Sequence, residues 1–306
     1  MSGPDLSTSF CGVELRNPVL LASGTCGYGT ELSSFLDLEQ LGGIVAKSLT
    51  VEPRRGNPPP RVTETPAGLL NAISLENVGV GAFLEEKLPA LPAGLPVFAS
   101  VFGTEIARYA EVCKRLAGAA IAGIEVNASC PHVRAGGIEF GQSREALAGL
   151  VRACRRATRG PLIVKLSPNV TSIAEMARVC EAEGADGISL INAVQALAVD
   201  VEARRPALRN GLGGLSGPAI RPIALRMVWQ ASRAVGIPIC GVGGIVTGED
   251  AVAFLLCGAS CVQVGTATYT DPCAGLHVRD SIAAYCERQG VERVGDLVGA
   301  LREETA

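Results

Sequence analysis

The feature that most constrains the fold is a repeated alternation of short apolar runs and longer helical patterns along the 306 residues. Eight runs rich in Val, Ile and Leu recur, at residues 18–23, 43–48, 96–101, 123–128, 162–166, 187–191, 238–242 and 261–265. Each run is almost continuously apolar, which is typical of parallel strands that are covered on both faces. Helical patterns lie between them, such as residues 104–116, where we expect Thr104 to cap the helix.

Eight strands alternating with helices predict an α/β fold, a (β/α)8 TIM barrel formed by residues 1–306 as a single domain. The alternative is an open doubly wound sheet, but no G-x-G-x-x-G follows the first run. Two long insertions, residues 52–75 and 193–217, follow the second and sixth runs, and the first of them has the pattern of a structureless, proline-rich loop. Because both follow strands, we expect both on the catalytic face.

The composition excludes several classes of protein. Lys and Arg number 27 against 30 Asp and Glu, so no basic surplus exists to bind nucleic acid. We expect no membrane span and no signal peptide. The 11 cysteines include no C-x-x-C pair and are accompanied by only two histidines, which indicates a cytoplasmic protein with no metal site. Most of the thiols are expected to be buried and inert.

The chemistry of a barrel collects at the carboxyl ends of its strands. Two lysines stand there, Lys47 and Lys165, and lysine is rare at inner positions without an anionic partner. The turns after the last two strands are rich in glycine, and their amides, with the start of a helix at Thr247, predict a phosphate site. Flavin mononucleotide (FMN) fits this set, since it has one phosphate and a ring that Lys165 can stabilise when reduced.

Cys130 follows the fourth strand in the segment NASCPHV. Pro131 restricts the backbone beside it, so we expect the thiol to project over the mouth of the barrel. A thiol in that position can act as a base or a nucleophile.

Nine motifs between residues 17 and 267 resemble those of a known family: NPVLLASGTCGYG, GGIVAKSLTVEPRRGNPPPR, ETPAGLLNAISLEN, EVNASCP, GGIEFG, VKLSPNVT, GGLSGPAI, GVGGI and VGTA. They resemble the class 1 dihydroorotate dehydrogenases, and most of all the catalytic subunit of type 1B. The resemblance implies an FMN-containing barrel that oxidises dihydroorotate to orotate in pyrimidine biosynthesis. It also implies a homodimer, or a heterotetramer with a partner subunit that carries FAD and a [2Fe–2S] cluster and reduces NAD.

The resemblance further implies the roles of individual residues. Cys130 is the base that takes the C5 proton while hydride leaves C6 for flavin N5. The implied flavin contacts are Ser23, Lys47, Ser48, Ser100, Asn127, Lys165, Ile191, Gly217, Gly243, Gly244, Gly265 and Thr266. The implied substrate contacts are Lys47, Asn71, Ala72, Ile73, Ser74, Leu75, Asn127, His132, Asn192 and Ala193.

Three positions depart from the family pattern, which usually has Asn at His132, Thr or Ser at Ala193, and Asn at Ser100. The sequence S-C-P-H also resembles the flavin domain of dihydropyrimidine dehydrogenases, which reduce uracil and thymine. The alternative function is therefore an FMN oxidoreductase of that kind or with another altered substrate. A third possibility is a paralogue that only binds FMN or acts on another ring, although Cys130 and Lys165 favour catalysis.

Overall fold

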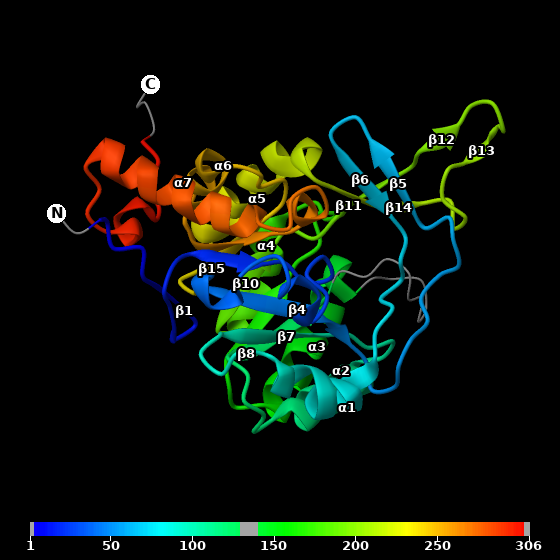
Figure 1. Cartoon of the computed structure of the whole chain (residues 1–306). Helices are drawn as coiled ribbons and strands as arrows, with labels where there is room; N and C mark the ends of the chain where they lie inside the picture. The colour runs from blue at the N-terminus through cyan, green and yellow to red at the C-terminus, as the bar shows by residue number, and fades with distance from the viewer. Residues whose placement is uncertain (1–2, 129–139, 303–306) are drawn as a thin grey trace.

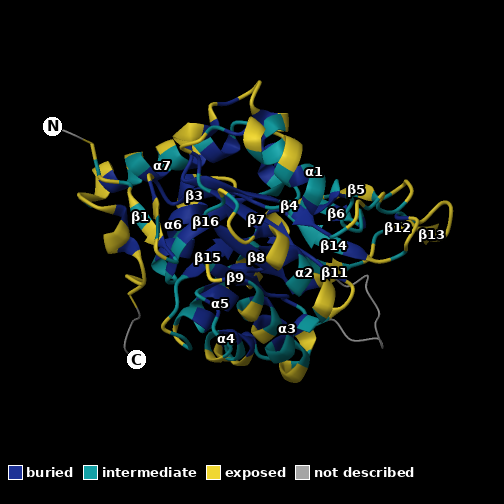
Figure 2. Ribbon diagram, turned by 90° about the horizontal axis from the view of Figure 1, so that it is seen from below, coloured by how far each residue is buried: buried dark blue, intermediate teal, exposed yellow. Residues whose placement is uncertain are grey.

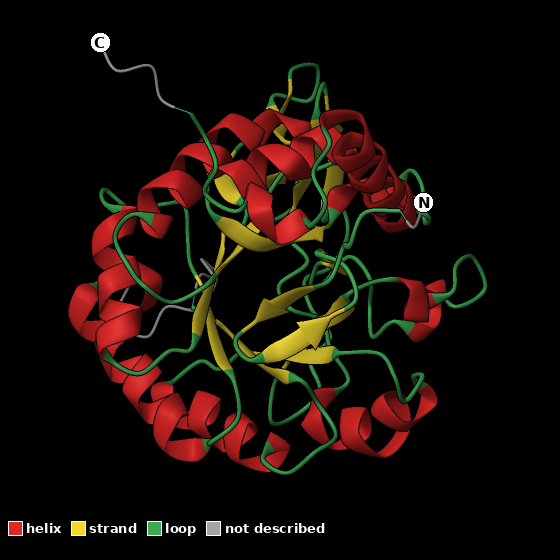
Figure 3. Cartoon of the chain, turned by 90° about the vertical axis from the view of Figure 1, so that its left-hand side faces the viewer, coloured by secondary structure: helices red, strands yellow, loops and turns green. Residues whose placement is uncertain are grey.

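The computed structural model describes residues 3–128 and 140–302, and its centre is a closed barrel of parallel strands in the order β10-β15-β16-β3-β4-β7-β8-β9. The helices form a ring around this barrel (Figure 3). All eight strands coincide with the predicted apolar runs, so the prediction of a TIM barrel is confirmed and the doubly wound sheet is excluded. The strands are β3 (Val19–Leu21), β4 (Gly43–Leu49), β7 (Val97–Val101), β8 (Gly123–Asn127), β9 (Leu162–Lys165), β10 (Gly187–Leu190), β15 (Ile239–Val242) and β16 (Ala259–Val264).

The outer helices are α1 (Gly79–Ala82), α2 (Ile106–Leu116), α3 (Arg144–Ala157), α4 (Ile173–Ala182), α5 (Arg221–Ser232), α6 (Gly248–Leu256) and α7 (Ala274–Gln289). Side chains cap three of them, because Ser143, Ser172 and Thr247 each accept a hydrogen bond from a backbone amide in the first turn. The expected cap at Thr104 is wrong, since α2 begins two residues later and the side chain at its N-cap position makes no cap bond. Within residues 3–128 and 140–302, no helix is long and apolar enough to cross a membrane.

Short helical turns connect these elements. They are η1 (Thr30–Leu32), η2 (Leu38–Gln40), η3 (Phe83–Lys87), η4 (Leu88–Ala90), η5 (Phe140–Gln142), η6 (Pro218–Ile220), η7 (Thr266–Tyr269) and η8 (Val294–Leu297). Only Gly265 separates β16 from the turn η7, so the first residue of η7 stands at the carboxyl end of the barrel.

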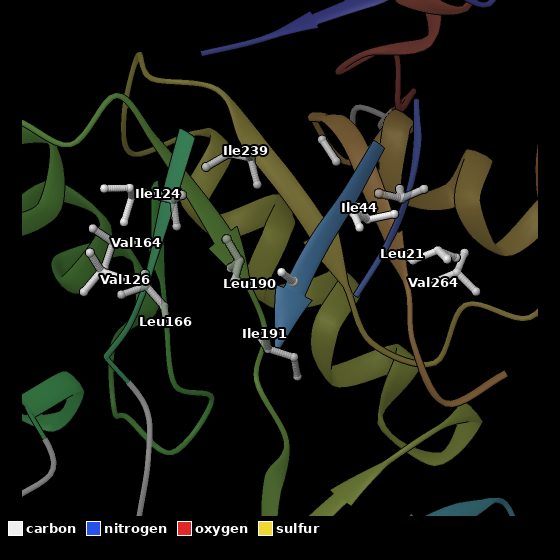
Figure 4. Close-up of a cluster of buried hydrophobic side chains, with 14 of the residues drawn as sticks. Leu21, Ile44, Ile124, Val126, Val164, Leu166, Leu190, Ile191, Ile239 and Val264 are labelled. Carbon is white, nitrogen blue, oxygen red and sulfur yellow. The ribbon is translucent and has the colours of Figure 1, made fainter. Parts of the chain in front are cut away.

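The main hydrophobic core lies between the strands and the helices. Every second strand residue points outward there, and Figure 4 shows Ile44, Ile124, Val126 and Val164 among these side chains. All four are at most 2% exposed. The continuous apolar character of the strands follows from this arrangement, because their inward positions are buried as well.

A second apolar cluster fills the amino-terminal half of the barrel interior. The antiparallel hairpin of β1 (Thr8–Phe10) and β2 (Val13–Leu15) closes that end. Its Phe10 packs against Phe98 with ring centroids 6.1 Å apart, and Leu20, Val45 and Ile163 surround them. The hairpin and the long insertions lie at opposite ends of the barrel (Figure 1).

The two insertions meet at the carboxyl end, as expected, but the first is not structureless. It contains β5 (Val62–Thr65) and β6 (Gly68–Asn71), which pair with two strands of the second insertion in the order β11-β14-β6-β5. The sequence pattern missed this hairpin because β6 gains its second neighbour, β14, only when the barrel has folded. The strands of the second insertion are β11 (Val194–Ala196), β12 (Val199–Asp200), β13 (Arg205–Pro206) and β14 (Gly213–Ser216), and the exposed pair β12–β13 projects from the molecule (Figure 2).

Candidate active site

A cavity of about 460 Å³ opens at the carboxyl end of the barrel, between the strand ends and the inserted sheet. A smaller cavity of about 130 Å³ adjoins it and shares Ser23, Asn71 and Asn192 with its wall. The predicted residues that line the larger cavity are Ser23, Lys47, Ser48, Asn71, Ala72, Ile73, Ser74, Leu75, Asn127, Asn192 and Ala193. Those that line the smaller one include Lys165, Ile191, Gly217, Gly243, Gly244, Gly265 and Thr266.

Two asparagines at the cavity are held in fixed orientations by a chain of hydrogen bonds. Asn192 Nδ2 donates to Asn127 Oδ1 over 3.2 Å, and Asn127 Nδ2 donates to Ser48 Oγ over 3.2 Å. Asn192 Oδ1 accepts from the amide of Ala193. Ser48 Oγ lies 2.8 Å from Ser100 Oγ, and Ser100 is completely buried behind it. Ser100 therefore does not line either cavity, although the resemblance gave it a flavin contact.

The loop that carries residues 71–75 has a strained backbone. Ser74 and Leu75 have φ of 63° and 56°, a left-handed conformation that side-chain-bearing residues rarely adopt. Asn57 Nδ2 donates to the carbonyl of Ala72 over 2.8 Å, and the Ala72 amide donates to the carbonyl of Arg61. These bonds hold the loop against the cavity, where its side chains can contact a ligand.

The glycine-rich turns after β15 and β16, where the sequence predicts an anion site, line the smaller cavity. Gly243 and Gly244 have φ of 132° and 75°, so these positions favour glycine. Among the described residues, the amides of Gly243, Gly244, Gly265 and Thr266 donate to no acceptor, which leaves them available for a phosphate. Just before α6, the amides of Val246 and Thr247 already donate to Asp250, so these two amides are not available to a phosphate.

Lys165 has an anionic partner inside the barrel. Its Nζ lies 3.9 Å from Glu125 Oε1 and donates to Gln263 Oε1 over 3.2 Å. Glu125 Oε2 accepts from Ser189 Oγ and from Gln263 Nε2, over 2.7 and 2.9 Å. Sequence reasoning missed both partners of Lys165, although the Glu within GIEVN and the Gln within CVQVG are visible exceptions in apolar strands.

The second lysine is different, because Lys47 is partly exposed at the cavity. It forms no ion pair with any residue in 3–128 or 140–302. Its ammonium group is therefore available to an anionic ligand.

The cysteines divide largely as expected. Seven of the ten described cysteines are buried. Burial raises the pKa of the Cys26 thiol to about 12, so this residue beside the cavity stays protonated at neutral pH. Cys130 and His132 lie outside the described residues.

Some residues at the cavity were missed by the prediction. They include Thr25, Arg61, Asn169, Gln195, Ser216 and Tyr269. Four of them stand in the quoted motifs, which could have found them: Thr25 in NPVLLASGTCGYG, Arg61 in GGIVAKSLTVEPRRGNPPPR, Asn169 in VKLSPNVT and Ser216 in GGLSGPAI. Tyr269 carries no comparable signal, because it reaches the cavity only through the turn η7.

The chain is similar to known proteins over almost its whole length. The family model of dihydroorotate dehydrogenase matches residues 5–285. Proteins of Pelobacter propionicus and of a Geobacter species, both named dihydroorotate dehydrogenase B (NAD(+)), catalytic subunit, are 52% and 50% identical over 300 and 303 residues. These matches cover 97% and 98% of this chain and 99% of each relative. A Solibacter usitatus protein, provisionally named dihydroorotate dehydrogenase A (fumarate), is 54% identical over 98% of this chain and 99% of its own length. The chain therefore belongs to the dihydroorotate dehydrogenase family.

Proposed function

We propose that this protein oxidises dihydroorotate to orotate in pyrimidine biosynthesis, with FMN as its cofactor. The observation that carries the proposal is the pair of adjoining cavities, which brings unpaired backbone amides, Lys165 and three asparagines to one place. Membership of the dihydroorotate dehydrogenase family supports the same reaction.

The smaller cavity fits the phosphate and part of the cofactor, and the rest of the flavin would extend into the adjoining larger cavity, where Lys47, Ser48 and Asn127 lie. The amides of Gly243, Gly244, Gly265 and Thr266 can hold its phosphate, since no described group competes for them. Ser23, Lys165, Ile191 and Gly217 would hold its ring. When bound, FMN supplies the acceptor for the hydride that leaves C6 of the substrate.

The larger cavity fits a carboxylated pyrimidine. Lys47 can pair with the substrate carboxylate. The amide groups of Asn71, Asn127 and Asn192 offer both donors and acceptors to the edge of the ring. Because hydrogen bonds fix Asn127 and Asn192 in advance, little side-chain motion is lost when the substrate binds.

We propose Cys130 as the base that removes the C5 proton, on the evidence of its position in EVNASCP. A thiol is one of the side chains that can act as a general base in such a proton transfer. His132 follows two residues later and is the proposed neighbour of the substrate in place of the usual Asn.

We further propose that the 306 residues form one domain and act in the cytoplasm as the catalytic subunit of a type 1B enzyme. In that assembly a homodimer binds two copies of a partner with FAD and a [2Fe–2S] cluster, which passes electrons to NAD. The names of two relatives support this assignment, whereas the Solibacter name points to fumarate. Reoxidation of the reduced protein by fumarate alone, without a partner, would contradict type 1B.

Anaerobic reduction of the purified yellow protein tests the main proposal. We expect dihydroorotate to bleach the flavin absorbance and dihydrouracil to do so far more slowly, because dihydrouracil differs only in lacking the carboxylate that Lys47 would bind. Bleaching by dihydrouracil alone would establish the dihydropyrimidine dehydrogenase-like alternative. A colourless protein that takes up no added FMN would overturn the proposal altogether.

A further inference from the structure

The carboxylate of Glu125 lies inside the barrel, and the proposed reaction does not use it. Glu125 is 1% exposed and stands in the middle of β8. Burying an ionised carboxylate is costly unless charges and hydrogen bonds compensate for the lost water. Its neighbours Ile124 and Val126 are apolar and belong to the main core, so the carboxylate between them needs an explanation.

The contacts of Glu125 connect it to Lys165, which lines the smaller cavity. Its Oε2 is satisfied by Ser189 and Gln263 from two other strands. Its Oε1 has no hydrogen-bond partner among the described residues, and Lys165 Nζ is 3.9 Å away. Gln263 bridges the pair, because its amide donates to Glu125 and accepts from Lys165.

Lys165 is the member of this group that reaches the cavity. It is 4% exposed, yet it lines the smaller cavity beside Ile191 and Gly244. Only one of its three N–H donors is used by a described hydrogen bond, to Gln263. A ligand in the cavity would therefore contact the ammonium group of Lys165 from the cavity side, while the carboxylate of Glu125 compensates its charge from inside the barrel.

We propose that Glu125 is a positioning residue that neutralises Lys165 from inside the barrel and so sets the net charge that this part of the cavity wall presents to the flavin. The inference rests on the proposed function in so far as the ligand is FMN. The ion pair itself is independent of that ligand. Because the pair is buried at low dielectric, the loss of one charge acts strongly on the other and on any ligand beside it.

A double-mutant cycle tests the pair without flavin. The variants are Glu125→Gln, Lys165→Met and the combination of both, and urea unfolding is measured on protein freed of FMN. Each single change leaves one buried charge without its partner, whereas the double change leaves none. We expect Lys165→Met to raise the unfolding equilibrium constant at least tenfold less in the Glu125→Gln variant than in the wild-type protein. Additive effects within twofold would overturn the inference.

If Glu125→Gln fails to fold, the double variant still tests whether the two charges are coupled. Recovery of folded protein by Lys165→Met would itself show that the two charges are coupled. Failure of the double variant as well would mean that the carboxylate is needed for a reason other than Lys165, which contradicts the inference.

The reduction potential of the FMN-loaded protein tests the effect on the flavin. Reduced flavin carries more negative charge than oxidised flavin, so an unbalanced Lys165 should favour the reduced form. We expect Glu125→Gln to shift the equilibrium toward it by about tenfold or more, which is about 30 mV for a two-electron couple. Ser189→Ala is the matched control, because it removes a hydrogen bond to Glu125 but no charge, and should shift the equilibrium by less than threefold.

The two measurements separate failure of the inference from failure of the proposed function. A yellow Glu125→Gln variant with an unchanged potential overturns the role of Glu125 toward flavin. A potential that Ser189→Ala shifts as far as Glu125→Gln does overturns it too, because the effect would then not be one of charge. A colourless wild-type protein refutes the proposed function instead, and the unfolding cycle then decides whether Glu125 and Lys165 act as a pair.

Discussion

The two halves of the barrel interior are built from the same strands but serve opposite purposes. Inward-facing positions two residues apart change from apolar to polar, as in Phe98 and Ser100 or Ile163 and Lys165. Cys261 and Gln263 repeat the change on β16. Side chains along a strand alternate with a period of two, so two residues further along a strand the inward-facing side chain is polar instead of apolar. The apolar cluster at the amino-terminal end is here called the floor of the barrel, and the polar side chains next to it are called the polar layer.

The difference shows how the barrel divides stability from chemistry. The floor is closed by the β1–β2 hairpin and by tight aromatic packing. The polar layer is largely buried as well, but its side chains are joined by hydrogen bonds and leave room above them for a ligand. Changes in the floor should therefore alter only the free energy of unfolding, whereas changes in the upper half should also alter binding and rate.

Two cysteines give the largest expected contrast. Cys130→Ser replaces the proposed base with a much weaker one, so flavin reduction by dihydroorotate should slow by about 10²–10⁴-fold at neutral pH. Cys261 lies completely buried in the floor. Cys261→Ala should leave the rate unchanged and lower only the midpoint of urea unfolding. Single-turnover absorbance measurements on both variants make the comparison, and equal rates for Cys130→Ser and wild type would remove Cys130 from the mechanism.

The floor itself is tested by Phe10→Ala. Phe10 is 3% exposed and packs on Phe98, so truncation should cost about 3–5 kcal/mol in the free energy of unfolding. Phe35 is 60% exposed, and Phe35→Ala should change that free energy by less than about 0.5 kcal/mol. FMN affinity of the folded protein should be the same in both variants. A Phe10→Ala protein of normal stability that no longer binds FMN would show that the two halves are not separable.

Much of this division could be predicted from the sequence, because parallel buried strands have a distinctive apolar pattern and the carboxyl ends of barrel strands form the site. The places of Lys165 and of the glycine-rich turns at the cavity follow from this rule, since all of them stand at the carboxyl ends of strands. The partners of Lys165 could not be predicted, since Glu125 and Gln263 stand on strands far apart in the chain and meet only when the barrel closes. The hairpin of β5 and β6 could not be predicted for the same reason, because β6 pairs with β14, which is far away in the chain.

Ser100 offers the finest test of the boundary between the halves. Its hydroxyl group orients Ser48, which in turn accepts from Asn127 at the cavity. Ser100→Ala should weaken orotate binding by about 0.5–1.5 kcal/mol through this chain, without touching the ligand. Ile163→Val, two positions before Lys165 on β9, should cost a similar free energy of unfolding and leave orotate binding unchanged. Titration of the flavin spectrum with orotate measures both dissociation constants. If Ser100→Ala binds orotate as tightly as wild type, the hydrogen-bond chain does not reach the ligand, and the functional half of the barrel begins above Ser48 rather than at Ser100.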